Sequence, residues 1–163
     1  MLSLGIDPGT ATVGYGLVRE LYDGSLQAVA YGTIATPPGI PMWERLKTIY
    51  DSVTTLITQH QPDHAGIEEL FFARNVTTAI TVAQGRGVIL LALAASGVPI
   101  TEYKPNMVKQ SVSGYGGAKK PQVQEMVRLL LNLNTVPQPD DAADALAVAI
   151  TDIHASRYKN LMD

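Results

Sequence analysis

Short apolar runs bounded by turn residues predict five β-strands in this chain. The runs cover Leu2–Asp7, Val13–Arg19, Leu26–Ala35, His64–Leu70 and Pro99–Tyr103. Pro8-Gly9-Thr10 and Tyr22-Asp23-Gly24 separate the first three runs, and connections as short as these join antiparallel strands. The first three strands are therefore expected to form an antiparallel meander.

Longer segments with helical character alternate with the remaining strands. In the first of them, apolar residues recur every three or four positions, which is the spacing of one helix face. Helices are predicted at Met42–Gln59, Val76–Ala95, Pro105–Val112, Pro121–Leu131 and Asp140–Arg157. The final residues, Tyr158–Asp163, are expected to fray.

The order of these elements predicts an α/β fold. Three meander strands followed by strands that alternate with helices give a mixed five-stranded sheet with helices on both faces. No internal repeat, low-complexity tract or linker interrupts the 163 residues. We therefore expect a single domain that spans residues 1–163.

Composition indicates the cellular compartment in which this domain is expected to work. The chain contains no cysteine, which excludes disulfides and thiolate metal sites and suits a reducing cytoplasm. No basic region followed by a long apolar stretch marks a signal peptide. The longest uncharged apolar run, Val88–Ile100, is shorter than a membrane span and fits a buried helix. We expect a cytoplasmic protein that does not bind a membrane.

Charge is distributed unevenly along the chain. The net charge is −3, but six basic residues and one acid lie between Phe71 and Lys120, so this segment carries +5 and the remainder −8. The asymmetry favours a basic face for a polyanion beside an acidic pocket for a metal. Ordinary solvated helices are the alternative explanation.

Four carboxylates interrupt or adjoin segments that should be buried. Asp7 ends the first strand, and Glu68 lies in a strand where alternation puts one acid on whichever face is buried. Asp141 and Asp144 share one face of the last helix, which is apolar nearly all round beyond them. A turn is an alternative role for Asp7, and helix capping for Asp140 or Asp141. Capping does not account for Asp144.

Carboxylates that converge would form a hard, all-oxygen metal site. With no cysteine and three scattered histidines, zinc is a poor candidate, whereas Mg²⁺ or Mn²⁺ suits oxygen ligands. Two such ions ~3.5–4 Å apart activate a water and stabilise a leaving oxygen in phosphodiester hydrolysis. The pattern therefore predicts a hydrolase with two Mg²⁺ ions per site, for which Mn²⁺ can substitute.

Aromatic and basic residues provide candidate contacts to a nucleic acid. These candidates are Phe71, Arg74, Lys109, Lys119 and Lys120. Phe71 is expected to stack on a base or wedge a base step, whereas Phe72 is assigned to the core. The lysines would hold phosphates without reading sequence, and a solubilising pair is the alternative for Lys119 and Lys120.

Several motifs occur in an order that is similar to one known family. They are Gly5-Ile6-Asp7-Pro8-Gly9-Thr10, Ile67-Glu68-Glu69, Phe71 with Ala73-Arg74-Asn75, Gln84-Gly85-Arg86-Gly87, Val108-Lys109-Gln110 and Asp141-Ala142-Ala143-Asp144-Ala145-Leu146-Ala147. From about Leu2 to about His154, the chain resembles the RuvC family of bacterial Holliday-junction resolvases. The resemblance implies a ribonuclease-H-like fold, a homodimer, and Mg²⁺-dependent symmetric nicking of four-way DNA junctions in recombination and repair.

The resemblance also implies roles for individual residues. The implied metal-binding and catalytic acids are Asp7, Glu68, Asp141 and Asp144. Lys109 and Lys120 match basic positions near the scissile phosphate or the DNA backbone, and Phe71 matches an aromatic at the junction. Asp140 and Asp141 compete for one ligand position, and the spacing to the next acid favours Asp141. A branch-migration motor of the RuvA and RuvB type is the implied partner complex.

Other interpretations stay open at this point. The first motif also resembles the phosphate loop of sugar kinases and actin-type ATPases, which use two such domains where this chain has room for one. A non-catalytic junction-binding module should have lost some of the acids, and a nuclease for RNA–DNA hybrids would share the fold. Gly85 and Gly87 inside a predicted helix indicate close packing, either within the chain or, by the resemblance, against a second subunit.

Overall fold

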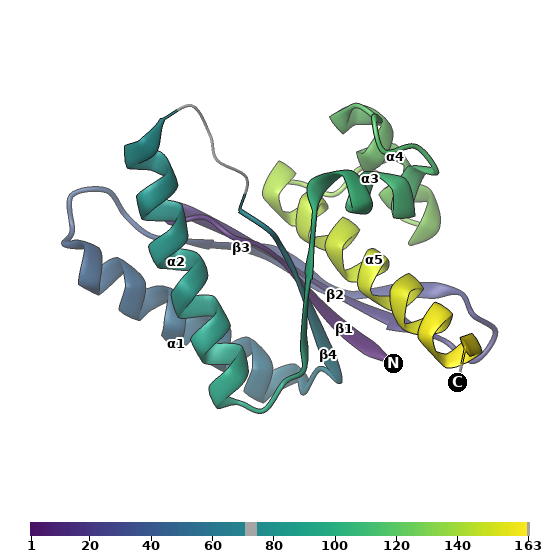
Figure 1. Cartoon of the computed structure of the whole chain (residues 1–163), viewed down its shortest axis with the longest axis horizontal. Helices are drawn as coiled ribbons and strands as arrows, with labels where there is room; N and C mark the ends of the chain where they lie inside the picture. The colour runs from purple at the N-terminus through teal and green to yellow at the C-terminus, as the bar shows by residue number, and fades with distance from the viewer. Residues whose placement is uncertain (71–74, 163) are drawn as a thin grey trace.

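Within residues 1–70 and 75–162, which the computed structural model describes, five helices cover a five-stranded sheet (Figure 1). The strands are β1 (Leu2–Asp7), β2 (Thr12–Glu20), β3 (Leu26–Ala35), β4 (His64–Glu68) and β5 (Ile100–Tyr103). The helices are α1 (Met42–His60), α2 (Val76–Ala95), α3 (Pro105–Ser113), α4 (Lys120–Leu130) and α5 (Asp140–Met162). The sequence predicts all of these elements, and most ends agree within two residues.

The sheet is mixed, as the order of the elements predicts. Its strand order is β3-β2-β1-β4-β5, with β1, β2 and β3 antiparallel and with β4 and β5 parallel to β1. Central strand β1 therefore ends at Asp7 on the same side of the sheet as β4 ends at Glu68. This arrangement is the ribonuclease-H-like fold.

Two apolar cores lie on opposite faces of the sheet. Helices α1 and α2 cover one face, and α5, flanked by α3 and α4, covers the other (Figure 1). Alternation along β1 sends Leu4 and Ile6 toward α1 and α2. The same alternation turns Gly5 and Asp7 toward α5, so one strand serves both a core and a site.

Helix α5 continues to Met162, beyond the expected end at Arg157. No glycine or proline interrupts the chain between Asp140 and Met162, so local sequence allows a continuous helix. Arg157 also fixes its last turns, because its Nε donates to Glu20 Oε1 at 2.6 Å and its Nη2 donates to the Gly24 carbonyl at 2.5 Å. These contacts explain why residues 158–162 are helical where fraying was expected.

Helix α2 is more exposed than its composition predicts. It is long and apolar enough to cross a membrane, yet only 28% of its most apolar window is buried. Ile80 and Leu91 are 56% and 60% exposed, so the expectation of a buried helix is wrong for this face. Arg86, near the middle of α2, pairs with Glu102 of β5 and ties the opposite side of the helix to the sheet.

Candidate active site

A row of glycines across three strands lets α5 lie directly on the sheet. Gly66, Gly5 and Gly16 are register partners on β4, β1 and β2. A Cβ added to Gly5 would lie 2.0 Å from the Ala145 carbonyl oxygen. A Cβ added to Gly16 would lie 2.8 Å from the Leu146 nitrogen. Because no side chain fits between helix and sheet, the close approach of α5 depends on these glycines.

The same close packing brings the start of α5 to the end of β1. Gly14 is the register partner of Asp7, and a Cβ on Gly14 would lie 2.0 Å from the Asp141 carbonyl oxygen. The first turn of α5 therefore rests on the strand pair at Asp7. Asp144 follows Asp141 by three residues and shares its helix face.

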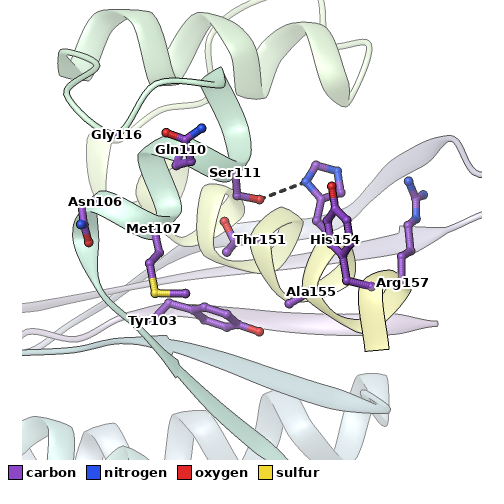
Figure 2. Close-up of a pocket in the computed structure, with 11 residues that line it drawn as sticks. Tyr103, Asn106, Met107, Gln110, Ser111, Gly116, Thr151, His154, Ala155 and Arg157 are labelled. Atoms are coloured by element: carbon purple, nitrogen blue, oxygen red, sulfur yellow. Dashed lines mark hydrogen bonds between the residues drawn. The ribbon is translucent and has the colours of Figure 1, made fainter. Parts of the chain in front are cut away.

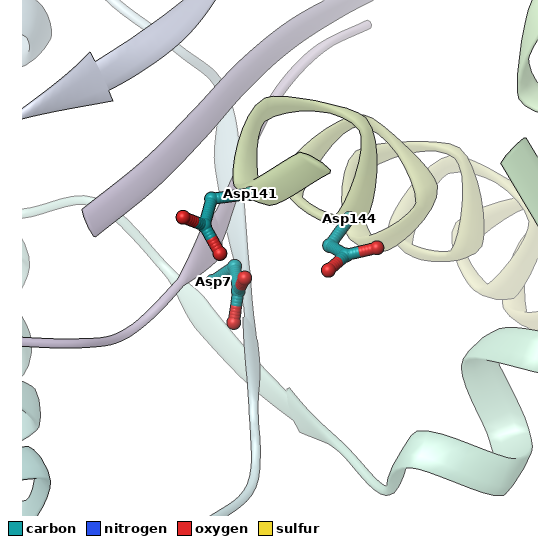
Figure 3. Close-up of side chains that lie close together, drawn as sticks. All are labelled: Asp7, Asp141 and Asp144. Carbon is teal, nitrogen blue, oxygen red and sulfur yellow. The ribbon is translucent and has the colours of Figure 1, made fainter. Parts of the chain in front are cut away.

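Three of the four predicted acids meet at this point. One carboxylate oxygen from each of Asp7, Asp141 and Asp144 lies within 4.8 Å of the others. Figure 3 shows the three side chains pointing toward one another from β1 and α5. Among the described residues, Glu68 is outside this close group, although its charge still acts on Asp7.

The cluster carries negative charge that the protein compensates poorly. Burial, followed by the charges of Asp144, Glu68 and Asp141, raises the pKa of Asp7 to about 8. Burial also raises the pKa of Asp144, against the opposing effect of Lys120. A carboxylate in such surroundings either binds a proton or gains a cation.

Glu68 is subject to the charges of one of the acids and of two predicted basic residues. Burial and the charge of Asp144 raise the pKa of Glu68, while Lys109 and Lys120 act to lower it. The structure therefore brings both lysines into the electrostatic surroundings of the acids.

The sequence leaves Asp140 and Asp141 competing for one ligand position. In the structure, their side chains point to different places. Asp141 belongs to the close group, whereas the Asp140 side chain is 57% exposed. Asp140 Oδ1 accepts a hydrogen bond from Gln124 Nε2 at 3.1 Å, and its Oδ2 lies 3.4 Å from Lys120 Nζ. Asp140 thus faces α4 while Asp141 faces Asp7.

Lys120, the first residue of α4, forms a salt bridge with an acid of the close group. Its Nζ lies 3.0 Å from Asp144 Oδ2. Partial burial lowers the pKa of Lys120, but its hydrogen bonds and charge contacts with Asp144 and Asp140 outweigh that effect and raise the pKa overall. The ammonium group therefore stays charged beside the acids.

The donor set fits a hard divalent cation. The close group supplies only carboxylate oxygens, which Mg²⁺ and Mn²⁺ prefer. The raised pKa values of Asp7 and Asp144 reflect a shortage of positive charge that such a cation would supply. The chemistry of the site is thus consistent with the cofactor expected from the sequence.

The remaining predicted residues have different outcomes. Lys119 precedes α4, and its backbone N–H donates to Gln122 Oε1 at 2.8 Å, while its exposed side chain is not part of the acid cluster. Phe71 and Arg74 lie outside the described residues, as does Phe72.

Sequence reasoning missed Arg86 as a residue that holds the site. Its Nε donates to the Glu68 carbonyl at 3.4 Å while its Nη2 pairs with Glu102. Arg86 therefore fixes the end of β4, which carries Glu68, against α2. A single base inside an apolar helix was the available signal, because a charge that is largely buried needs a partner.

A separate cavity of about 910 Å³ lies between α3 and the second half of α5 (Figure 2). Its lining residues are Tyr103, Asn106, Met107, Gln110, Ser111, Gly116, Thr151, His154, Ala155, Arg157 and Tyr158. Ser111 Oγ and His154 Nδ1 lie 3.0 Å apart across it, and burial lowers the pKa of His154. None of the four predicted acids lines this cavity, so it is distinct from the carboxylate site.

The sheet and the acids at the ends of β1 and α5 define a ribonuclease-H-like protein with a carboxylate site. The chain belongs to the RuvC family, because the family model described as crossover junction endodeoxyribonuclease RuvC matches residues 3–152. A relative of that name from Chloroflexus aggregans is 60% identical over 92% of this chain and 91% of its own length.

Solved structures agree with this assignment. The structure of Thermus thermophilus RuvC is 35% identical and superposes with a TM-score of 0.91 over 98% of this chain and 97% of its own. T. thermophilus RuvC in complex with a Holliday junction substrate is 34% identical, with a TM-score of 0.93 over 98% and 96% of the two chains. The yeast mitochondrial Holliday junction resolvase Ydc2, at 14% identity and a TM-score of 0.69, shares the fold.

Proposed function

We propose that this protein is a structure-selective DNA endonuclease that resolves four-way junctions by symmetric paired nicks, in recombination and repair. The observation that carries the proposal is the meeting of Asp7, Asp141 and Asp144 within 4.8 Å in a chain of the RuvC family. The relative solved with a Holliday junction substrate covers 98% of this chain, which supports the same class of substrate here. The domain acts as one nuclease unit over residues 1–163.

The four acids would hold two Mg²⁺ ions, with Mn²⁺ as a substitute. Asp7 is the acid on which the charges of the other three all act, and it is the proposed shared ligand, with Glu68, Asp141 and Asp144 completing the set. When bound, the cations supply activation of a water nucleophile and stabilisation of the departing 3′ oxygen. The reaction has no covalent enzyme intermediate, and its products carry a 5′ phosphate and a 3′ hydroxyl.

Lys109 and Lys120 would stabilise negative charge on the phosphate. Lys120 is paired with Asp144 at 3.0 Å, and a cation on Asp144 would weaken that pair and free the ammonium for the DNA. Lys119 and the residues Phe71 and Arg74 complete the proposed DNA contacts. Phosphate contacts of this kind fix the position of the junction, while Phe71 would contact its bases.

A homodimer fits a substrate with two-fold symmetry, and we assign its interface to α2. Gly85 is explained inside the chain, because a Cβ there would lie 2.7 Å from the Gly9 carbonyl oxygen. A Cβ on Gly87, in contrast, would have no neighbour within 4 Å among the described residues. Gly87 shares the exposed face of α2 with Ile80 and Leu91, where a second copy would bury them. The enzyme would act in the cytoplasm with a motor of the RuvA and RuvB type.

One assay tests the central claim. The protein is incubated with Mg²⁺ and a labelled four-way junction, alongside a linear duplex and an RNA–DNA hybrid of the same sequence. Symmetric nicks confined to the junction are expected. Cleavage of the hybrid in preference to the junction, or junction binding without cleavage at any Mg²⁺ or Mn²⁺ concentration, would reject the proposal.

A further inference from the structure

The turn that follows Asp7 is held from two sides by hydrogen bonds of the buried residue Thr10. Thr10 is 6% exposed, and its hydroxyl donates to the Thr81 carbonyl of α2 at 2.5 Å. On the other side, the Thr10 carbonyl accepts from the hydroxyl of Thr36, a residue that is 4% exposed, at 2.6 Å. Thr10 thus links α2 to the end of β3 through the turn between β1 and β2.

The chain of bonds continues beyond Thr36. Arg45 Nε, on α1, donates to Thr36 Oγ1 at 2.9 Å, and the Thr36 backbone N–H donates to the Ala11 carbonyl at 3.0 Å. Gly85 of α2 adds a steric contact, because its lack of a side chain lets the Gly9 carbonyl approach. Residues 9–11 are therefore fixed by contacts from α2 and from Thr36 at the end of β3, and Thr36 is in turn held by Arg45 of α1.

A turn held in this way limits how far the end of β1, which carries Asp7, can move. Once Asp7 is ionised, as a metal ligand must be, the charges of Asp144, Glu68 and Asp141 act against its carboxylate, and the end of β1 could relieve this repulsion by moving away. Because Thr10 follows Asp7 by only three residues, its bonds to Thr81 and Thr36 oppose such a movement. Groups that hydrogen-bond a metal ligand directly commonly change metal affinity by ~10–100-fold when removed, and Thr10, which acts through the turn, is expected at the lower end of that range.

We propose that Thr10 is a positioning residue for the metal site, which holds Asp7 in place by bonding its turn to α2. This inference rests on the proposed role of Asp7 as a metal ligand. Thr10 itself does not touch the substrate or the cation. Its hydroxyl sets the geometry of the strand end from which the Asp7 carboxylate projects.

The test measures metal binding by the free protein, without DNA. Mn²⁺ is titrated into wild-type protein and into Thr10→Val, Thr10→Ser and Thr58→Val, and free Mn²⁺ is followed by electron paramagnetic resonance. Thr10→Val should weaken Mn²⁺ binding about tenfold, and Thr10→Ser, which keeps the hydroxyl, should stay within about threefold of wild type. Thr58→Val is the matched control, since its hydroxyl bonds only the Thr54 carbonyl one turn back on exposed α1. It should bind as wild type does.

Unchanged Mn²⁺ binding by Thr10→Val would overturn the inference, as would equal losses in Thr10→Val and Thr10→Ser. If Thr10→Val does not fold, Gly85→Ala provides a second test, because its Cβ would press on the Gly9 carbonyl from the α2 side and should also weaken Mn²⁺ binding. Asp7→Asn separates this inference from the proposed function. Normal Mn²⁺ binding by Asp7→Asn rejects the metal site itself, whereas loss in Asp7→Asn with normal binding in Thr10→Val rejects only the role of Thr10.

Discussion

At the scale of single residues, the charges of the carboxylate site disfavour folding. Asp7 is a ligand only when ionised, yet its pKa of about 8 keeps it largely protonated at neutral pH in the absence of a cation. Metal and proton therefore compete for the same oxygen atoms, so metal affinity should rise with pH. The site is destabilised by its own charges, as functional sites often are.

Asp7→Asn should stabilise the metal-free protein at pH 8 and change its stability little at pH 4. The pKa of Asp7 is raised from 3.8 to about 8, so between these values the folded state binds more protons than the unfolded state. Stability then falls as pH rises through that window, and neutral asparagine removes the loss, by about 1–3 kcal/mol at pH 8. Urea unfolding in EDTA at both pH values measures the difference. Parallel pH dependence of wild type and Asp7→Asn would contradict the raised pKa.

Asp141→Asn and Asp140→Asn form a matched pair for the choice between adjacent acids. Asp141 lies in the close group, whereas Asp140 is exposed and faces α4. Asp141→Asn should weaken Mn²⁺ binding at least tenfold, because a charged ligand is lost, and Asp140→Asn should stay within about threefold. Calorimetric titration of Mn²⁺ compares the two. A larger effect of Asp140→Asn would assign the ligand position to Asp140 instead.

At the scale of elements, the sequence predicts which segments form but not how closely they pack. Hydrophobic periodicity locates every strand and helix, because burial of one face sets that period. It does not predict the row of Gly66, Gly5 and Gly16, since the register between strands follows from long-range pairing. Glycines inside apolar strands were a signal of close backbone approach, although sequence alone does not say what approaches.

For the carboxylate site as well, the sequence predicts some of the arrangement and leaves the rest open. Spacing on one helix selects Asp141 and Asp144 as a pair, because three residues return to the same face. Nothing in the spacing separates Glu68 from the close group or pairs Lys120 with Asp144. Those distances depend on how far each strand end extends and on where α4 lies, which only the assembled fold determines.

Gly16→Ala should destabilise the protein by about 2–4 kcal/mol, whereas Gly32→Ala should cost less than about 1 kcal/mol. A Cβ on Gly16 meets the backbone of α5 at Leu146, so helix and sheet must separate. A Cβ on Gly32 meets the end of the Tyr15 side chain at 2.9 Å, and that ring can rotate away. Urea unfolding followed by circular dichroism compares the two. Equal losses would show that α5 does not depend on close contact with the sheet.

At the scale of the whole molecule, a single chain already brings together the three acids of the close group. Asp7, Asp141 and Asp144 come from β1 and α5 of one chain, and the exposed face of α2 contributes no ligand. Dimerisation through α2 would therefore not build the site. Its effect would be to pair two sites across a two-fold axis, so that one binding event leads to two opposed incisions.

Leu91→Glu should separate dimerisation from metal binding. A carboxylate at this 60% exposed position would be buried without a partner in the proposed dimer, so the variant should sediment as a monomer. Mn²⁺ binding should stay within about twofold of wild type, since no ligand or supporting contact of the acid cluster changes. Leu129→Glu, at a 53% exposed leucine on α4, is the matched control and should remain dimeric.

Incision of a supercoiled plasmid that extrudes a cruciform measures the functional consequence. Two nicks made within one binding event linearise the plasmid, whereas independent single nicks first accumulate open circles. Wild type and Leu129→Glu should yield mainly linear product, and Leu91→Glu should yield open circles at a rate reduced by at least tenfold, because a monomer makes only half of the phosphate contacts. Linear product from a monomeric Leu91→Glu would show that pairing of the two cuts does not require the α2 interface. A dimeric Leu91→Glu would place the subunit contact on another face.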